Sequence, residues 1–180
     1  MRTRALRNIV KTIEAINEHR HKKRNTLLVL LGIYTGLRIS ELLNLDIEDI
    51  KINGKISDAI VFRGKGRKTR QVPLSRRIQV LLEDYLKNYE VGPLFVSQMG
   101  KRMSRFQAYV IMRNIAMKTS QTNVATHSLR KTFAQSLLDA GVDVETMRVL
   151  LGHSSISVTQ RYIETDESKM FAAVGRLSFG

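Results

Sequence analysis

Four short segments of this sequence hold cationic or hydrogen-bond-donating side chains beside glycines or at predicted helix boundaries. In TGLRISEL, Arg38 comes just after the break at Gly36, and Glu41 follows three residues later. Residues three apart share one face of a helix, so the carboxylate can orient the guanidinium toward an anion. An ordinary local ion pair explains this segment equally well, because such pairs are common and weak.

The second segment is a basic hairpin tip. Residues 63–70 hold five basic side chains and no acidic one, namely Arg63, Lys65, Arg67, Lys68 and Arg70. A glycine-flanked tip of this kind can enter a DNA groove and contact phosphates. A run of charges is usually a solvated hairpin, but the positive charge of the whole chain favours the DNA-contacting interpretation here. It is not a nucleotide-binding P-loop, because the four-residue spacer between the glycines and the Ser or Thr after the lysine are absent.

The other two segments place a histidine near an arginine or a tyrosine. His127 and Arg130 lie in the first turn of a predicted helix, where the helix dipole and free N–H groups favour an anion, and Lys131 follows them. His153 follows a helix-stopping glycine, and Tyr162 comes nine residues later. Taken singly, each is more often a surface or packing residue, so only their combination points to a phosphate-binding site.

Charge and composition narrow the class of protein. The chain has 180 residues, 30 Lys and Arg against 16 Asp and Glu, and a formal charge of +14, which favours nucleic acid first and an anionic membrane surface second. A hydrophobic fraction of 43% is enough for one packed domain. The absence of cysteine excludes disulfides and thiolate chemistry. No apolar run is long enough to span a bilayer, and a cytoplasmic location is expected.

The elements that must position these residues follow from periodicity and caps. The pattern predicts a mainly α-helical domain with a small three-stranded antiparallel β-sheet. Strands are expected over Asp49–Ile52, Ala59–Phe62 and Thr69–Leu74, and a loop over His19–Arg24. Helices are expected over about Leu6–Asn17, Asn25–Tyr34, Ile39–Asn44, Arg76–Asn88, Ser104–Met117, Thr126–Ala140, Asp143–Leu151, Ser155–Tyr162 and Glu167–Val174.

From about Asn25 to Tyr162 the chain closely resembles the catalytic domain of the tyrosine recombinase (phage integrase) family. The segments TGLRISEL, the GKG hairpin, HSLRKTFA and LGHSSISVTQRY occur in the family's order and near its spacing. The resemblance implies that family's mostly helical fold. It also implies site-specific cleavage and rejoining of DNA through a 3′-phosphotyrosyl intermediate, with no metal, ATP or other cofactor.

Matched motif by motif, the resemblance implies a catalytic set. It consists of Arg38, Lys65, His127, Arg130, His153 and Tyr162, with Glu41 in support. The two arginines would clamp the phosphate, and His153 would bond a non-bridging oxygen. Tyr162 would attack the phosphorus, His127 would help take its proton, and Lys65 would protonate the leaving 5′ oxygen.

Several alternatives share parts of this pattern. A type IB topoisomerase shares the chemistry, and a regulator derived from a recombinase would bind DNA without cleaving it. A basic RNA-binding protein fits the charge, but an aromatic content of 6% leaves few stacking platforms. His19 and His21 are an unpromising metal pair, because the surrounding basic residues would repel a cation.

The resemblance also suggests a division of the chain and a set of partners. We expect a basic arm over residues 1–24 that grips DNA, a catalytic domain over 25–165, and a tail helix over 166–180 that docks in cis or in trans. Most family members carry a further DNA-binding domain upstream, whereas about 37 residues precede Arg38 here. This is either an excised catalytic domain or a naturally short recombinase. The expected partner is double-stranded DNA, bound by a protein that is monomeric when free and tetrameric on paired sites, with no membrane association.

Overall fold

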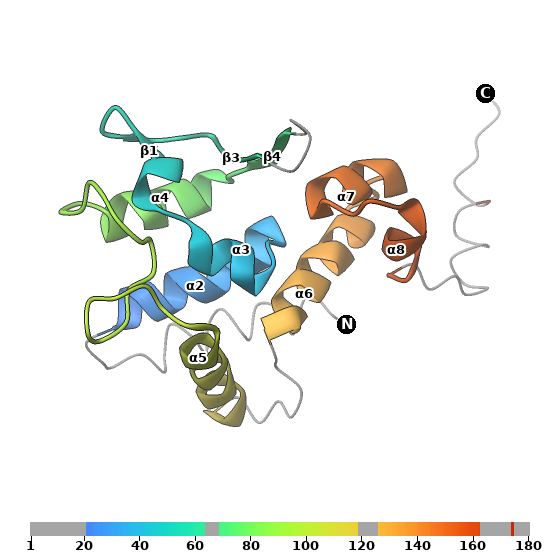
Figure 1. Cartoon of the computed structure of the whole chain (residues 1–180). Coiled ribbons are helices and arrows are strands. Elements are labelled where there is room, and N and C mark those ends of the chain that lie inside the picture. The colour runs from blue at the N-terminus through green and yellow to red at the C-terminus, as the bar shows by residue number, and fades with distance from the viewer. Residues whose placement is uncertain (1–20, 64–68, 119–125, 163–173, 175–180) are drawn as a thin grey trace.

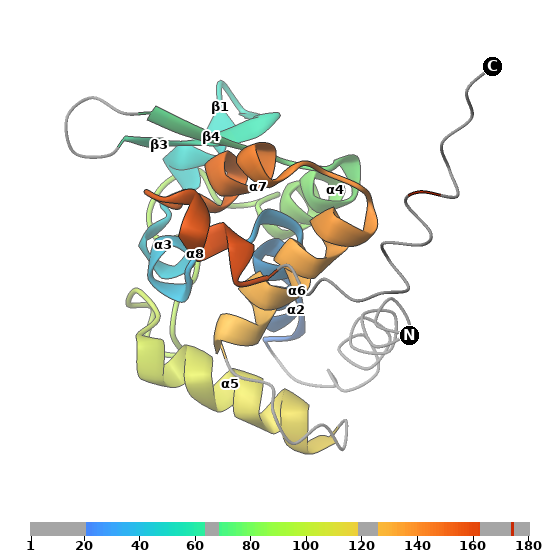
Figure 2. The ribbon, with the colours of Figure 1, turned by 90° about the vertical axis from the view of Figure 1, so that its right-hand side faces the viewer.

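The computed structural model describes residues 21–63, 69–118, 126–162 and 174. Within these ranges the chain forms a helical body with two small β-hairpins at one end and α5 at the opposite end (Figures 1 and 2). The predicted helices over 6–17 and 167–174 fall outside the described ranges, except for Val174. None of the described helices is long and apolar enough to cross a membrane.

Helices make up most of the described chain, which confirms the expected fold class. The helices are α2 (Lys22–Thr35), α3 (Ile39–Asn44), the short 3₁₀ helix η1 (Ile47–Asp49), α4 (Arg76–Tyr85), α5 (Arg105–Lys118), α6 (Thr126–Asp139), α7 (Val144–Leu151) and α8 (Ile156–Gln160). The strands are β1 (Lys51–Ile52), β2 (Lys55–Ile56), β3 (Ala59–Arg63) and β4 (Thr69–Pro73).

Helix α2 is the central element, because it packs against α3, α4 and α6. Its run from Leu27 to Leu31 is buried without interruption, as expected of a helix that is apolar on all sides. The expected loop over His19–Arg24 is wrong from Lys22 onward, because α2 begins there. Arg24 is buried in this first turn, where it donates to the Val96 carbonyl (2.7 Å) and to the side chain of Asn25. These acceptors satisfy a charge that the sequence suggests is solvated.

Two two-stranded antiparallel sheets replace the expected three-stranded sheet. Asn53 and Gly54 both have positive φ (52° and 75°), and this tight turn folds β2 back onto β1. The segment expected to pair with β3 is thus already paired. Ser57 then bonds with its side chain to the backbone of Ala59 and starts a separate β3–β4 hairpin.

Gly36 ends α2 in the left-handed conformation (φ 63°), and its N–H bonds to the Gly32 carbonyl. A Cβ at this position would lie 2.2 Å from Cδ1 of Phe133 on α6. The chain therefore turns from α2 toward α3 against an aromatic ring, in a space that admits glycine alone. This turn sets where Arg38 begins α3.

Replacing Gly36 by alanine should destabilise the fold more than the same change at Gly141. Both glycines have positive φ, but a Cβ at Gly141 would meet nothing within 4 Å. Gly141→Ala should therefore lower the free energy of unfolding only by the cost of holding alanine in the left-handed conformation, about 1–2 kcal/mol. Gly36→Ala adds the clash with Phe133 and should cost at least about 3 kcal/mol. Urea denaturation measures both, and equal losses would contradict the close packing at Gly36.

Candidate active site

Arg38 stands at the N-terminal end of α3, with Glu41 three residues beyond it. The Arg38 backbone N–H donates to Oε2 of Glu41 (2.7 Å), and Nη1 donates to Oε1 (3.0 Å). One carboxylate therefore both caps the helix and aims the guanidinium. The Arg38 side chain remains about half exposed (47%), so it is oriented and still accessible to an anion.

Arg130 on α6 is buried and joins two other parts of the chain. Its Nη1 donates to the Gly36 carbonyl (2.6 Å), and its Nη2 donates to the Leu151 carbonyl at the end of α7. Burial lowers the pKa of this guanidinium, and the positive charge of Arg38 lowers it further. An arginine whose pKa is lowered in this way still remains protonated at neutral pH. Arg130 is thus a fixed cation held by backbone oxygens.

Arg70, expected to contact DNA, points inward instead. Its side chain is only 15% exposed. Nη1 donates to the Leu151 carbonyl (3.0 Å), Nη2 lies 3.2 Å from Oε1 of Glu41, and the guanidinium sits over the Phe62 ring. A Cβ at Gly152 would lie 1.8 Å from Nη1, so Arg70 occupies the space that this left-handed glycine leaves open.

Glu41 therefore serves two arginines. Burial alone would raise its pKa, but the bond from the Arg38 backbone and the charges of Arg70 and Arg38 outweigh burial and lower the pKa below its ordinary value. The carboxylate stays ionised well into the acid range. It joins α3 to β4 at the edge of the candidate site.

His153 and Tyr162 lie together on the far side of Arg130. Their rings are almost parallel (4°), with centroids 6.2 Å apart. His153 is buried, and Nδ1 lies 2.8 Å from the Thr159 hydroxyl oxygen. Burial, followed by the charges of Arg130, Arg38 and Arg70, lowers the pKa of His153 to about 4. The ring is therefore neutral at neutral pH, beside fixed cations.

The remaining predicted residues are distributed differently. His127 and Lys131 are exposed on α6, and His127 lies one turn before Arg130. Arg63 ends β3. Lys65, Arg67 and Lys68 lie outside the described residues, so their predicted roles stay predictions. The structure brings Arg38, Glu41, Arg130, His153 and Tyr162 into one neighbourhood, in which Arg130 senses the charges of Arg38, Glu41 and Tyr162.

Sequence reasoning missed the groups that hold these side chains. The Leu151 carbonyl accepts hydrogen bonds from two arginines. Every residue has a backbone carbonyl, so the identity of residue 151 does not predict this role. Thr159 was missed although its position gave a signal, because it precedes Tyr162 by three residues in a predicted helix and so shares its face.

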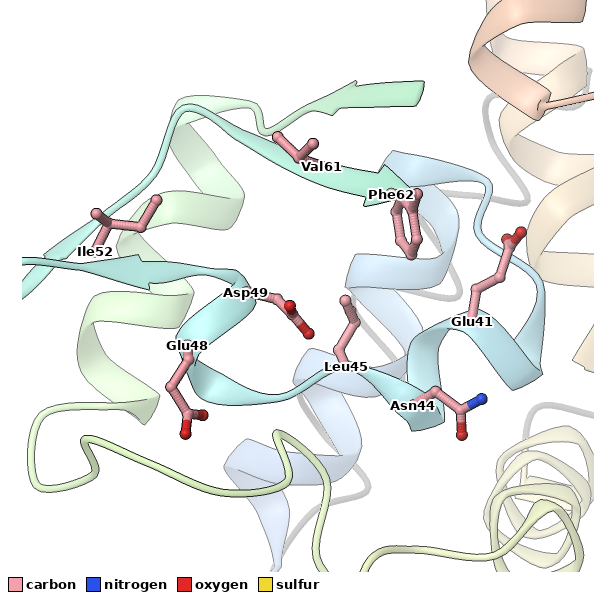
Figure 3. Close-up of a pocket in the computed structure, with 8 residues that line it drawn as sticks. All are labelled: Glu41, Asn44, Leu45, Glu48, Asp49, Ile52, Val61 and Phe62. Carbon is pink, nitrogen blue, oxygen red and sulfur yellow. The ribbon is translucent and has the colours of Figure 1, made fainter. Parts of the chain in front are cut away.

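A pocket of about 630 Å³ adjoins the site at Glu41 and opens between α3, η1 and β3. Figure 3 shows Phe62 and Leu45 pointing toward each other across it, with Glu48 and Asp49 of η1 on one side. Its carboxylates would repel a phosphate, so the phosphate-binding side is that of Arg38 and Arg130. In the parts of the chain that the structure describes, no three His, Cys, Asp or Glu residues are grouped to hold a metal ion.

Comparisons with known proteins point to one family. The model of the phage integrase family matches residues 2–169. The tyrosine recombinase XerA of Pyrococcus horikoshii is 35% identical over 156 residues, which are 84% of this chain and 54% of that protein. XerD of Mycobacterium tuberculosis is 35% identical over 149 residues, or 77% of this chain and 47% of that protein. The chain thus spans about half the length of these curated relatives.

Solved structures give the same result for the fold. One of them is the XerH site-specific recombinase bound to difH substrate in a pre-cleavage complex. It matches with a TM-score of 0.77 and 26% sequence identity, and the match covers 95% of this chain and 52% of that chain. A XerA recombinase structure gives a TM-score of 0.76 at 26% identity, covering 96% of this chain and 61% of that one.

His153 should titrate near pH 4, far below the ordinary histidine pKa of 6.5. Because the folded pKa is the lower one, the contribution of His153 to stability is fully present above about pH 6.5 and is lost as the pH falls toward 4. Histidine ring NMR measures the pKa directly. Arg70→Met should raise it by removing one cation, whereas Arg113→Met, on the exposed side of α5, should not. A wild-type pKa near 6.5 would contradict the burial and charge argument.

Proposed function

This chain belongs to the phage integrase family, and from that membership we propose that it is a site-specific DNA recombinase. It cleaves and rejoins double-stranded DNA through a 3′-phosphotyrosyl intermediate. The observation that supports the proposal is that Arg130 and His153 lie close to Tyr162 and within the influence of Arg38, with both arginines already oriented by protein acceptors.

The two arginines bind the scissile phosphate. Attack on a phosphodiester increases the negative charge on its non-bridging oxygens, and the planar guanidinium is suited to bind such oxygens through paired hydrogen bonds. Arg38 and Arg130 are oriented before the DNA arrives, so little reorganisation accompanies the reaction. Removing one preorganised donor of this kind typically costs roughly 3–4 kcal/mol of activation free energy.

Tyr162 supplies the nucleophile. A bond forms between its phenolic oxygen and phosphorus, and the bond from phosphorus to the 5′ oxygen breaks. His127 takes the phenolic proton, and Lys65 gives a proton to the leaving 5′ oxygen. The phosphotyrosyl bond preserves the energy of the phosphodiester. A second 5′-hydroxyl can therefore reverse the step on another strand without ATP.

Charge supports the choice of duplex DNA as the substrate. A formal charge of +14 exceeds what one phosphate needs, so the remainder serves to bind the backbone. Lys131, exposed one residue after Arg130, is placed to add such a contact, and Arg63, Arg67 and Lys68 of the hairpin are the other candidates. We propose a cytoplasmic location for this activity.

Incubation with a nicked suicide substrate should trap a covalent protein–DNA adduct, because the cleaved fragment diffuses away and the reverse step is lost. Tyr162→Phe should abolish the adduct, since it removes the attacking oxygen. Tyr89→Phe is the matched control: its ring is exposed beside Tyr85, and the adduct should persist. The substrates should carry recombination sites of the related proteins. An adduct that survives Tyr162→Phe would refute the mechanism, and a regulator would form none at all.

Exchange between two sites requires several protomers, so we propose a monomer in free solution and a tetramer on paired DNA sites. The sequence beyond residue 165 places Met170, Phe171, Val174 and Leu177 at helical spacing, and of these only Val174 lies within the described residues. If this segment is helical, the four side chains share one apolar face. We propose that it docks on a neighbouring protomer. Truncation after Thr165 should then lower the mass of the DNA-bound assembly in sedimentation while leaving single-site binding. An assembly of unchanged mass would indicate docking within one protomer.

A further inference from the structure

The main chain of His153 is held from both sides by one residue. Its N–H donates to the Arg148 carbonyl (3.0 Å), and its own carbonyl accepts from Nη1 of Arg148 (2.9 Å). Glu145 bonds to Nε and Nη2 of the same guanidinium (2.7 and 2.6 Å). These bonds fix the backbone at position 153, but they leave the imidazole free to rotate and to choose its tautomer.

Thr159 meets that ring. Its Oγ1 lies 2.8 Å from Nδ1 of His153, and Thr159 is fully buried (0% exposed) while His153 is 7% exposed. A buried hydroxyl needs a partner, and a β-branched side chain in a helix has few rotamers. The hydroxyl is therefore a fixed group. Since it occupies Nδ1, Nε2 is the ring nitrogen left for a ligand.

The protonation state decides what Nε2 can do. Burial and the nearby Arg130, Arg38 and Arg70 keep the ring neutral at neutral pH, and a neutral imidazole carries one N–H. If the Thr159 hydroxyl donates to Nδ1, the proton must reside on Nε2, which then donates to a phosphate oxygen. If Nδ1 carried the proton and donated to Thr159, Nε2 would present a lone pair that repels the same oxygen.

We propose that Thr159 is a positioning residue, whose hydroxyl donates to Nδ1 of His153 and so keeps the ring proton on Nε2, facing the scissile phosphate. This role rests on the proposed recombinase function. It gives the site a neutral donor beside the two cationic ones. A neutral donor can bond one phosphate oxygen without adding to the repulsion among Arg38, Arg70 and Arg130.

Thr159 also reaches the nucleophile. Its carbonyl accepts the backbone N–H of Tyr162 (3.0 Å), while its side chain holds His153, whose ring lies parallel to that of Tyr162. Thr159 therefore contacts the ring of His153 through its side chain and the main chain of Tyr162 through its carbonyl.

The tautomer can be measured in the free protein. With ¹⁵N-labelled histidine, long-range ¹H–¹⁵N spectra distinguish a protonated from an unprotonated ring nitrogen, and comparison with His153→Gln assigns the signals. Wild type should show Nε2 protonated and Nδ1 bare. Thr159→Val keeps the shape of the side chain, removes the hydroxyl and should produce a mixture of tautomers. Thr159→Ser should restore the wild-type pattern. A wild-type ring protonated on Nδ1, or a Thr159→Val spectrum identical to wild type, would overturn the proposal.

The rate of covalent adduct formation gives the second readout. Thr159→Val should lower it by roughly 10–100-fold, the range found when partners that orient metal-bound imidazoles are removed. The amount of DNA bound should change little, and Thr159→Ser should recover most of the rate. Ser157→Ala is the matched control, because its hydroxyl lies on the same helix but bonds to Ser155; it should leave the rate unchanged. A purely structural role for Thr159 would lower the melting temperature of Thr159→Val but leave the tautomer unmoved.

The two proposals fail in different ways. A wild-type protein that forms no adduct on any recombination site would refute the recombinase function, while the spectra would still decide the tautomer. An active wild type whose Thr159→Val variant is folded and equally fast would refute the role of Thr159 alone.

Discussion

The carbonyl oxygen of Leu151 is the acceptor on which the candidate site depends. It lies at the C-terminal end of α7, where backbone carbonyls lack helical partners and carry partial negative charge. Arg70 reaches it from β4 and Arg130 reaches it from α6. β4 is thus joined at one atom to the consecutive helices α6 and α7, and the fold itself holds both guanidiniums.

This arrangement has an electrostatic cost. Arg38, Arg70 and Arg130 lie close enough for their charges to act on His153, yet Glu41 is the carboxylate that compensates them in this neighbourhood. Nε of Arg70 is buried and has no hydrogen-bond partner among the described residues, although the guanidinium lies over the Phe62 ring. Under the proposed function, a bound phosphate would offset this surplus of positive charge.

Local patterns in the sequence predict most of the helices of the described chain. Periodicity and caps placed α3 and α7 within a residue or so of their observed bounds, since Asp143 and Gly152 are strong helix signals. The first turn of α2 was misjudged because the buried Arg24 looks like a solvated charge. The sheet was misjudged because the tightness of the turn at Gly54, and not the apolar pattern, determines which strands pair.

The sequence pointed to side chains in recognised motifs, and their roles at the phosphate stay predictions, but it did not show how the fold holds them. Arg38 and Arg130 lie in recognisable motifs. Arg70, by contrast, has no feature in the sequence that distinguishes it from the other basic residues of the hairpin. Its inward orientation depends on the Leu151 carbonyl and on the empty space above Gly152, neither of which is visible in residue types.

The close approach of Arg70 to Gly152 has an evolutionary consequence. Because the guanidinium fills the volume that a Cβ would need, a mutation at either position changes what the other tolerates. A side chain at position 152 would displace the Arg70 guanidinium from its present place, and with it the bond to the α7 carbonyl, unless the residue at position 70 were shorter. These two positions, far apart in the chain, are therefore constrained to evolve together.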